Sequence, residues 1–117
     1  NVKMKLIVKK WFILSIAIYL ASVLLNGFSA ETATAIIIAS ALLGIFNVFI
    51  KPVLIFITLP INLLTLGLFT FVINALLLYM VSSIVKGIYL DSFWSALLAS
   101  IIISILSMII NWIFADR

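Results

Sequence analysis

The sequence contains no cysteine and no histidine. Disulfide bonds and thiolate chemistry are therefore excluded, and so are metal sites and acid–base catalysis that depend on imidazole. Carboxylates are nearly absent as well, since the chain has only Glu31, Asp91 and Asp116. A catalytic carboxylate pair needs two such groups to converge, and nothing in the spacing of these three favours this. We therefore expect neither an enzyme nor a bound cofactor or metal.

Charge of either sign is scarce: 9% of the 117 residues are charged and 68% are hydrophobic. That leaves too little polar surface to coat a water-soluble protein. Four apolar stretches are long enough to cross a bilayer as helices, which takes about 20 residues: residues 6–25, 32–50, 66–85 and 93–114. None alternates with period two, and open sheet edges cannot face lipid. The sequence predicts an all-α integral membrane protein with four transmembrane helices in one membrane domain, residues 1–117.

The net charge of +4 does not indicate a nucleic-acid partner, because the basic residues flank the apolar stretches. Six of them fall on one side of the predicted spans: Lys3, Lys5, Lys9, Lys10, Lys51 and Arg117. The other side has only Lys86. By the positive-inside rule, both termini face the cytoplasm, and the lipid bilayer is the expected partner. A cleaved signal peptide is the competing interpretation of the basic N-terminus, but Phe28 is too large for the position three residues before a cleavage site.

The chain repeats weakly at an offset of 60 residues. The informative matches are Gly27 with Gly87 and Glu31 with Asp91, because a glycine followed by an acid recurs at the same point of two loops. Other matches at this offset are Tyr19 with Tyr79, Ser22 with Ser82, Thr32 with Ser92, Ala39 with Ala99 and Ser40 with Ser100. We predict two tandem hairpins, residues 6–51 and 67–114, related by a pseudo-two-fold axis along the membrane normal.

The two loops carry matching helix-end signals. Gly27 and Gly87 follow the first and third spans, where a glycine in the left-handed conformation caps a helix. Thr32 and Ser92 then open the second and fourth spans, where a hydroxyl accepts a hydrogen bond from a free backbone N–H group.

The connecting segment, residues 52–66, is apolar but too short for a span, and it contains Pro52 and Pro60. We predict that proline breaks it into an interfacial or re-entrant segment. Polar residues at helical spacing form a stripe along it that extends back into the second span: Asn47, Lys51, Thr58, Asn62 and Thr65. The segment is either a plain elbow between the hairpins, or its stripe lines a polar path or contacts lipid head groups.

Small residues recur one turn apart in the second and fourth spans, and these let helix backbones approach closely in lipid. They are Ala39, Ser40, Gly44, Ala96, Ser100 and Ser104. We predict that these two spans form the close-packed centre of the monomer or of a homo-oligomer; a pore lining is the alternative. Asn47 and Asn74 serve as interhelical hydrogen-bonding groups or as ligands, and Lys51 either extends to the interface or binds anionic head groups.

Several short motifs together resemble one family of small membrane proteins. They are Asn47-Val-Phe-Ile-Lys-Pro52, Thr58-Leu-Pro60, Leu64-Thr-Leu-Gly-Leu-Phe69, Asn74-Ala-Leu76, Asp91-Ser-Phe93 and Ala96-Leu97. In this order they resemble the four-span, superfamily-IV phage holins, many of which are encoded on bacterial chromosomes. The chain departs from the expected pattern at Leu14, where an asparagine would match Asn74 of the second repeat.

The resemblance implies a bacterial cytoplasmic-membrane protein, and family members without phage context look like cell-envelope proteins. Three hypotheses follow. The first is a self-associating, holin-like protein that forms a permeation path or acts in envelope homeostasis. The second is a small transport or lipid-handling protein that uses the polar stripe. The third is an accessory subunit that packs against a larger membrane partner.

Overall fold

The computed structural model describes residues 2–115, so the predictions that involve Asp116 and Arg117 lie outside the described residues. The chain is helical apart from two three-residue strands. The elements are α1 (Val2–Leu24), β1 (Phe28–Ala30), α2 (Ala33–Ile57), α3 (Leu59–Leu64), α4 (Phe69–Ile84), β2 (Ile88–Leu90) and α5 (Phe93–Phe114). Helix α1 begins before the predicted span and therefore contains the N-terminal lysines that we expected to precede it.

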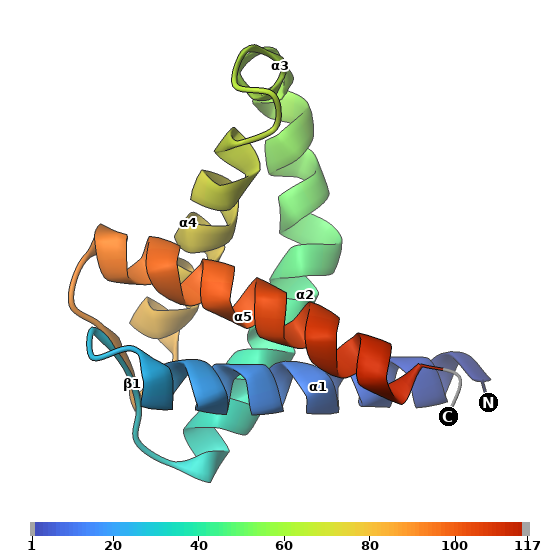
Figure 1. Ribbon diagram of the computed structural model, residues 1–117, viewed down its shortest axis with the longest axis vertical. Coiled ribbons are helices and arrows are strands. Elements are labelled where there is room, and N and C mark those ends of the chain that lie inside the picture. The colour runs from blue at the N-terminus through green and yellow to red at the C-terminus, as the bar shows by residue number, and fades with distance from the viewer. Residues whose placement is uncertain (1, 116–117) are drawn as a thin grey trace.

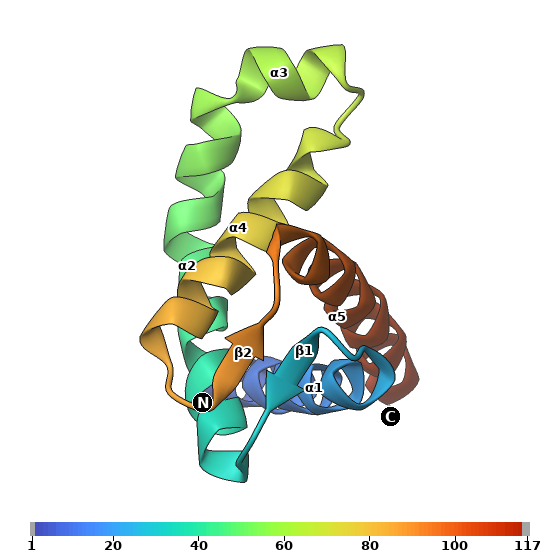
Figure 2. The ribbon, with the colours of Figure 1, turned by 90° about the vertical axis from the view of Figure 1, so that its left-hand side faces the viewer.

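The long helices pack as two crossing pairs (Figures 1 and 2). Helix α1 runs antiparallel to α5, and α2 runs antiparallel to α4, with further packing of α4 on α5 and of α1 on α2. The short strands lie together at one end of the molecule, whereas α3 and the two described chain ends lie away from them (Figure 1).

The strands β1 and β2 join the two halves of the chain through contacts that repeat at the 60-residue offset. They pair antiparallel with Ser29 opposite Tyr89, which are equivalent positions of the repeat. Beyond the strands, the Glu31 N–H donates to the Gly87 carbonyl at 2.8 Å, and the Asp91 N–H donates to the Gly27 carbonyl at 3.0 Å. The two hydrogen bonds are equivalent, because exchanging the two halves of the chain converts one into the other.

Both loop glycines are required by close packing, but only one has the predicted conformation. Gly87 has a φ of +98°, and a Cβ there would lie 2.9 Å from the Cβ of Ala35. Gly27 does not have a positive φ, so the prediction of a left-handed cap there is wrong. A Cβ at Gly27 would instead collide with the side chain of Ser95. Ala35 and Ser95 are themselves equivalent, so each glycine admits the first turn of a helix from the other half.

The predicted N-caps of α2 and α5 are confirmed. Thr32 Oγ1 accepts the Ala35 N–H at 3.0 Å, and Ser92 Oγ accepts the Ser95 N–H at 3.3 Å. These hydroxyls satisfy backbone donors that have no partner within the helix.

Helix α2 does not end at Pro52, contrary to our prediction, but continues through it to Ile57. A helical proline removes one backbone hydrogen bond, a loss that membrane helices tolerate when their surroundings compensate. The chain turns instead at Thr58, which ends α2 and precedes α3 with φ −95° and ψ 14°. Pro60 lies in the first turn of α3, where its missing N–H costs nothing.

A Schellman turn ends α3 and shortens the third predicted span. The Gly67 N–H donates to the Asn62 carbonyl at 2.7 Å, and the Leu66 N–H donates to the Leu63 carbonyl at 3.3 Å. Leu66 and Gly67 have φ values of +57° and +88°, which no helix accommodates, so α4 starts only at Phe69. Its 16 residues extend about 24 Å, less than the roughly 30 Å of a bilayer core.

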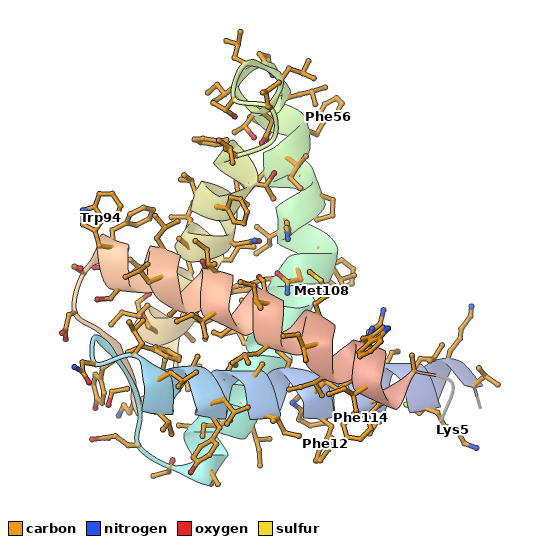
Figure 3. All side chains as sticks on the ribbon, viewed as in Figure 1. Lys5, Phe12, Phe56, Trp94, Met108 and Phe114 are labelled. Carbon is orange, nitrogen blue, oxygen red and sulfur yellow. The ribbon has the colours of Figure 1, made fainter. Side chains whose placement is uncertain are left out.

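Large apolar side chains cover much of the outer surface (Figure 3), and Phe56, Trp94 and Met108 are 76%, 72% and 69% exposed. The buried core includes Ala17, Ile18, Leu77, Leu78 and Val81. Helices α1, α2 and α5 are long and apolar enough to cross a membrane, and α4 is a shorter apolar helix. This inventory is consistent with a four-span membrane protein whose outer face contacts lipid.

Helices α2 and α5 do not form the close-packed centre of the single chain, so that prediction is wrong for the monomer. Their backbones make no close contact with each other in the part of the chain that the structure describes. Buried small residues such as Ala39, Ala96 and Ala99 lie in helices that pack instead against α1 and α4. Because the α1–α5 pair crosses the α2–α4 pair, α2 and α5 move apart from each other as they lead away from the strands.

Candidate functional site: a polar cavity between α1, α2 and α5

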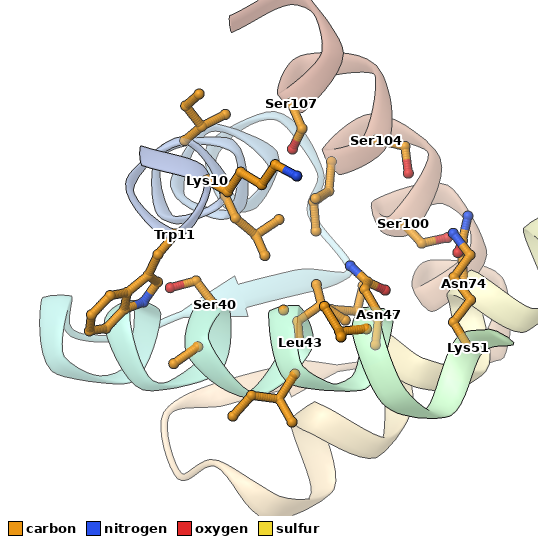
Figure 4. Close-up of a pocket in the computed structure, with 18 of the residues that line it drawn as sticks. Lys10, Trp11, Ser40, Leu43, Asn47, Lys51, Asn74, Ser100, Ser104 and Ser107 are labelled. Carbon is orange, nitrogen blue, oxygen red and sulfur yellow. The ribbon is translucent and has the colours of Figure 1, made fainter. Parts of the chain in front are cut away.

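A cavity of about 960 Å³ lies where α2 and α5 diverge. Its walls are residues 7–14 of α1, 40–51 of α2 and 100–111 of α5, with two residues of α4, Asn74 and Leu78. The lining segments of α2 and α5 start seven residues after each helix begins, so the cavity lies away from the strand pair. Figure 4 shows Lys10, Asn47 and Ser107 directed toward the space between these helices.

The most buried polar residues of the cavity are the equivalent serines Ser40 and Ser100, which are 1% and 6% exposed. Each hydroxyl donates to a carbonyl of its own helix, Ser40 to Ile37 and Ser100 to Leu97, both at 2.9 Å. Ser40 also shares a 2.7 Å hydrogen bond with Ser15 of α1. These serines are thus satisfied within the protein.

The remaining polar side chains of the cavity have no such partners. Within residues 2–115, no hydrogen bond or ion pair engages the side chains of Lys10, Asn47, Lys51, Asn74, Ser104 and Asn111. Ser107 adds a hydroxyl oxygen that is buried without any hydrogen-bond partner. Of these side chains, Lys10, Asn47, Ser104 and Asn111 are exposed, whereas Lys51, Asn74 and Ser107 are half-buried. Polar side chains that line a cavity without protein partners can hydrogen-bond to an occupant such as water, an ion or a polar head group.

The charge of the cavity is positive. Lys10 of α1 and Lys51 of α2 both line it, and no aspartate or glutamate of residues 2–115 does. The neighbouring Lys9 differs, because its ammonium donates to the Phe114 carbonyl at 3.1 Å. Ionisable residues within membrane helices typically face an internal cavity and mark a functional site. Lys51, which is half-buried, fits that description, whereas Lys10 is exposed on α1.

The structure divides the predicted polar path into two groups. Asn47, Lys51 and Asn74 line the cavity, together with Ser40, Gly44, Ser100 and Ser104, which were predicted from their small size. Thr58, Asn62 and Thr65 do not line it, because the turn at Thr58 directs α3 away from the axis of α2 (Figure 2).

The second group forms its own hydrogen-bonded elbow. The Asn62 amide donates to Thr58 Oγ1 at 3.0 Å and accepts from Thr70 Oγ1 at 3.1 Å. Thr65 Oγ1 accepts the Phe69 N–H at 3.2 Å and so connects α3 to α4. These hydrogen bonds hold the elbow together and link α2, α3 and α4.

Sequence reasoning missed Lys10, Ser107 and Asn111 as cavity residues. Lys10 looked like one of several basic residues preceding a span. The repeat could have indicated the other two, because Ser107 is equivalent to Asn47 and Asn111 to Lys51. The two halves thus contribute polar side chains to the cavity at matching positions.

The family profile described as "Mycobacterial 4 TMS phage holin, superfamily IV" matches residues 4–109. The chain belongs to this family. The match to the superfamily-IV holins includes every residue that lines the cavity except Asn111. The predicted resemblance is therefore confirmed, and with it the assignment as a membrane protein with transmembrane helices.

Two relatives align over most of their length with this superfamily-IV holin. "Uncharacterized membrane protein YvlD" of Bacillus subtilis is 41% identical over 107 residues, which cover 87% of this chain and 90% of the relative. "Uncharacterized protein SCO3922" of Streptomyces coelicolor is 34% identical over 109 residues, covering 88% and 87% respectively. No solved structure matches the chain.

Proposed function

We propose that this holin-family protein is a non-catalytic protein of the bacterial cytoplasmic membrane that self-associates and provides a polar permeation path through the hydrocarbon core. The observation that carries the proposal is the cavity, in which most of the polar side chains have no hydrogen-bond partner among residues 2–115. A polar cavity between membrane helices lowers the cost of bringing water or an ion to membrane depth. Controlled leakage of water or ions through this path would give the protein a role in envelope homeostasis.

The proposed topology places both termini in the cytoplasm. Its support is the distribution of basic residues: the lysines of α1 and Lys51 lie in the helix halves remote from the strands, whereas Lys86 lies in the loop before β2. Positive residues near short loops favour the cytoplasmic side. A cysteine introduced at Lys86 would then react with an impermeant maleimide added to intact cells, and one introduced at Lys3 would not.

In this topology the halves form two tandem hairpins, and their pseudo-two-fold axis follows the membrane normal. The reciprocal hydrogen bonds between Glu31 and Gly87 and between Asp91 and Gly27 support the symmetry. We place the axis through the strand pair and the cavity. Segment α3 then lies as an elbow at the cytoplasmic interface.

Self-association is proposed to use the open wall of the cavity. Ser40 and Ser100 are buried within the single chain, but Ser104 is exposed and a Cβ at Gly44 would meet nothing within 4 Å. These small positions remain accessible to a second copy of the chain, and small residues favour helix association in lipid.

Release of ions and graded-size dyes from liposomes containing the purified protein tests the proposal. We expect leakage from the wild type and its loss in Gly44→Leu/Ser104→Leu, which fills the cavity wall. Ser83→Leu is the matched control, because Ser83 is exposed and its hydroxyl bonds only to its own helix. Tight liposomes with folded wild-type protein would contradict the permeation role. Cross-linking of the same samples reports self-association separately.

An accessory role in a larger complex gives a different result. Affinity purification from native membranes would then yield a second membrane protein at constant stoichiometry, and the isolated chain would not leak. Lipid handling is a further candidate, which the lysines of the cavity favour.

A further inference from the structure

We infer that the cavity binds a phosphate-bearing anion, with Lys10 and Lys51 as the charged contacts and Asn47 as a hydrogen-bond donor between them. The inference deepens the proposed function by naming the chemical class that the cavity selects. If the inference holds, the cavity recognises one class of ligand and is not simply a water-filled passage.

The absence of counter-charge is the first argument. Lys10 and Lys51 line one cavity, and none of the acidic residues in the described part of the chain lines it with them. The two acidic residues within the described range, Glu31 and Asp91, lie in the loops beside the strands, at the other end of the molecule. An anion bound in the cavity would supply the counter-charge that the lining residues within 2–115 do not provide.

The chemistry of the remaining groups is the second argument. Asn47, Asn74 and Asn111 each carry an amide NH₂ that donates to no other residue in the described part of the chain. Together with the lysines and the hydroxyls of Ser104 and Ser107 they supply many donors, whereas the lining residues within 2–115 include no carboxylate acceptor. A phosphate group presents several acceptor oxygens and matches such a donor-rich site.

The position of the cavity is the third argument. Its lysines belong to the helix halves remote from the strands, which is the end where the basic residues of α1 also lie. In the proposed topology this end faces the cytoplasmic leaflet, which is rich in anionic lipid. Figure 4 shows Lys10 on the α1 side of the cavity and Lys51 with Asn74 on the opposite side, so an anion between them would contact several helices.

The phosphate group could belong to a lipid head group or to a free phosphate ion, and experiments can distinguish the two. We would measure retention of phosphatidylglycerol by the delipidated full-length protein in detergent, using native mass spectrometry, with phosphatidylcholine as the uncharged comparison. In parallel, isothermal titration with inorganic phosphate tests a free anion. We expect Lys10→Gln and Lys51→Gln each to weaken binding roughly tenfold, as expected for the loss of one charged hydrogen bond.

Lys86→Gln is the matched control, because it removes one positive charge at the strand end and leaves the cavity intact. Lysine-dependent retention of phosphatidylglycerol supports a head-group site, and lysine-dependent titration by phosphate alone supports a soluble anion. Equal binding by the wild type and Lys10→Gln/Lys51→Gln overturns the inference, as does equal weakening by Lys86→Gln.

Two further measurements keep these outcomes interpretable. Asn47→Leu keeps both charges but removes a donor, so it should weaken binding even if a lysine variant fails to fold. Binding without liposome leakage would contradict the permeation role alone, whereas leakage without lysine-dependent binding would contradict the phosphate site alone.

Discussion

The two ends of this molecule are built from the same repeat but in opposite ways. At the strand end, equivalent residues make equivalent contacts, and two glycines admit helices of the other half without space for a Cβ. At the cavity end, equivalent positions carry different side chains, Lys51 against Asn111 and Asn47 against Ser107, and these have no partners among the described residues. One end is packed and symmetric, and the other is open and asymmetric.

The difference separates stability from function. Close packing requires a glycine at residues 27 and 87, so both halves have one there. The cavity end imposes no such fit, because its side chains contact space and not one another. It is therefore the region where residue chemistry is free to serve an occupant, and substitutions at the two ends should have different effects.

The largest effect is expected at the packed end. Gly87→Val should lower the free energy of unfolding by about 3 kcal/mol, because it places a branched side chain at a positive φ and against Ala35. Thermal unfolding in detergent, followed by circular dichroism, measures this. Gly44→Ala is the control, since a Cβ there meets nothing within 4 Å. Equal melting temperatures for the two variants would show that the strand end is not tightly packed.

A smaller effect of the opposite sign is expected at the open end. Asn47→Leu should raise the free energy of unfolding by about 1 kcal/mol, because it removes an amide without a partner from membrane depth. The same change should reduce liposome leakage. Destabilisation together with unchanged leakage would mean that the Asn47 amide contributes to the fold and not to the cavity.

Three serines, Ser15, Ser40 and Ser100, test the asymmetry between the halves. Ser15→Ala and Ser40→Ala should each cost about 0.6 kcal/mol, as for other interhelical hydrogen bonds in membranes, because their hydroxyls lie 2.7 Å apart. A double-mutant cycle isolates the coupling. Ser100→Ala should cost less, since Ser100 bonds only to its own helix. A cost at Ser100 equal to that at Ser40 would contradict the assigned contacts.

The smallest effect is expected at Ser107. Its hydroxyl oxygen is buried without a partner, so Ser107→Ala should leave the free energy of unfolding unchanged or raise it by a few tenths of a kcal/mol, about the size of a neutral surface substitution. Thermal unfolding with the Ser104→Ala variant alongside measures this. A clear loss of stability would indicate that the hydroxyl holds an ordered water.

Much of the fold could be predicted because a bilayer imposes strong constraints on sequence. Local residues were sufficient to predict the apolar stretches, the caps at Thr32 and Ser92, and the family. The extent of α2 was not, because proline has a poor helix propensity that membrane surroundings override at Pro52. Gly27 was misread for a similar reason: its lack of a side chain serves a distant contact with Ser95 and not its own backbone conformation.

The membrane environment, the helical class and the repeat could be predicted from the sequence alone. Hydropathy and residue spacing are local patterns that can be recognised within one or two helical turns. Only the tertiary structure decided that α2 and α5 diverge, that Lys10 and Lys51 line one cavity, and that Thr58 and Asn62 do not. The physical reason is that the relative placement of helices depends on packing between segments far apart in the chain. The residue pattern within one helix does not specify the angle at which that helix crosses another.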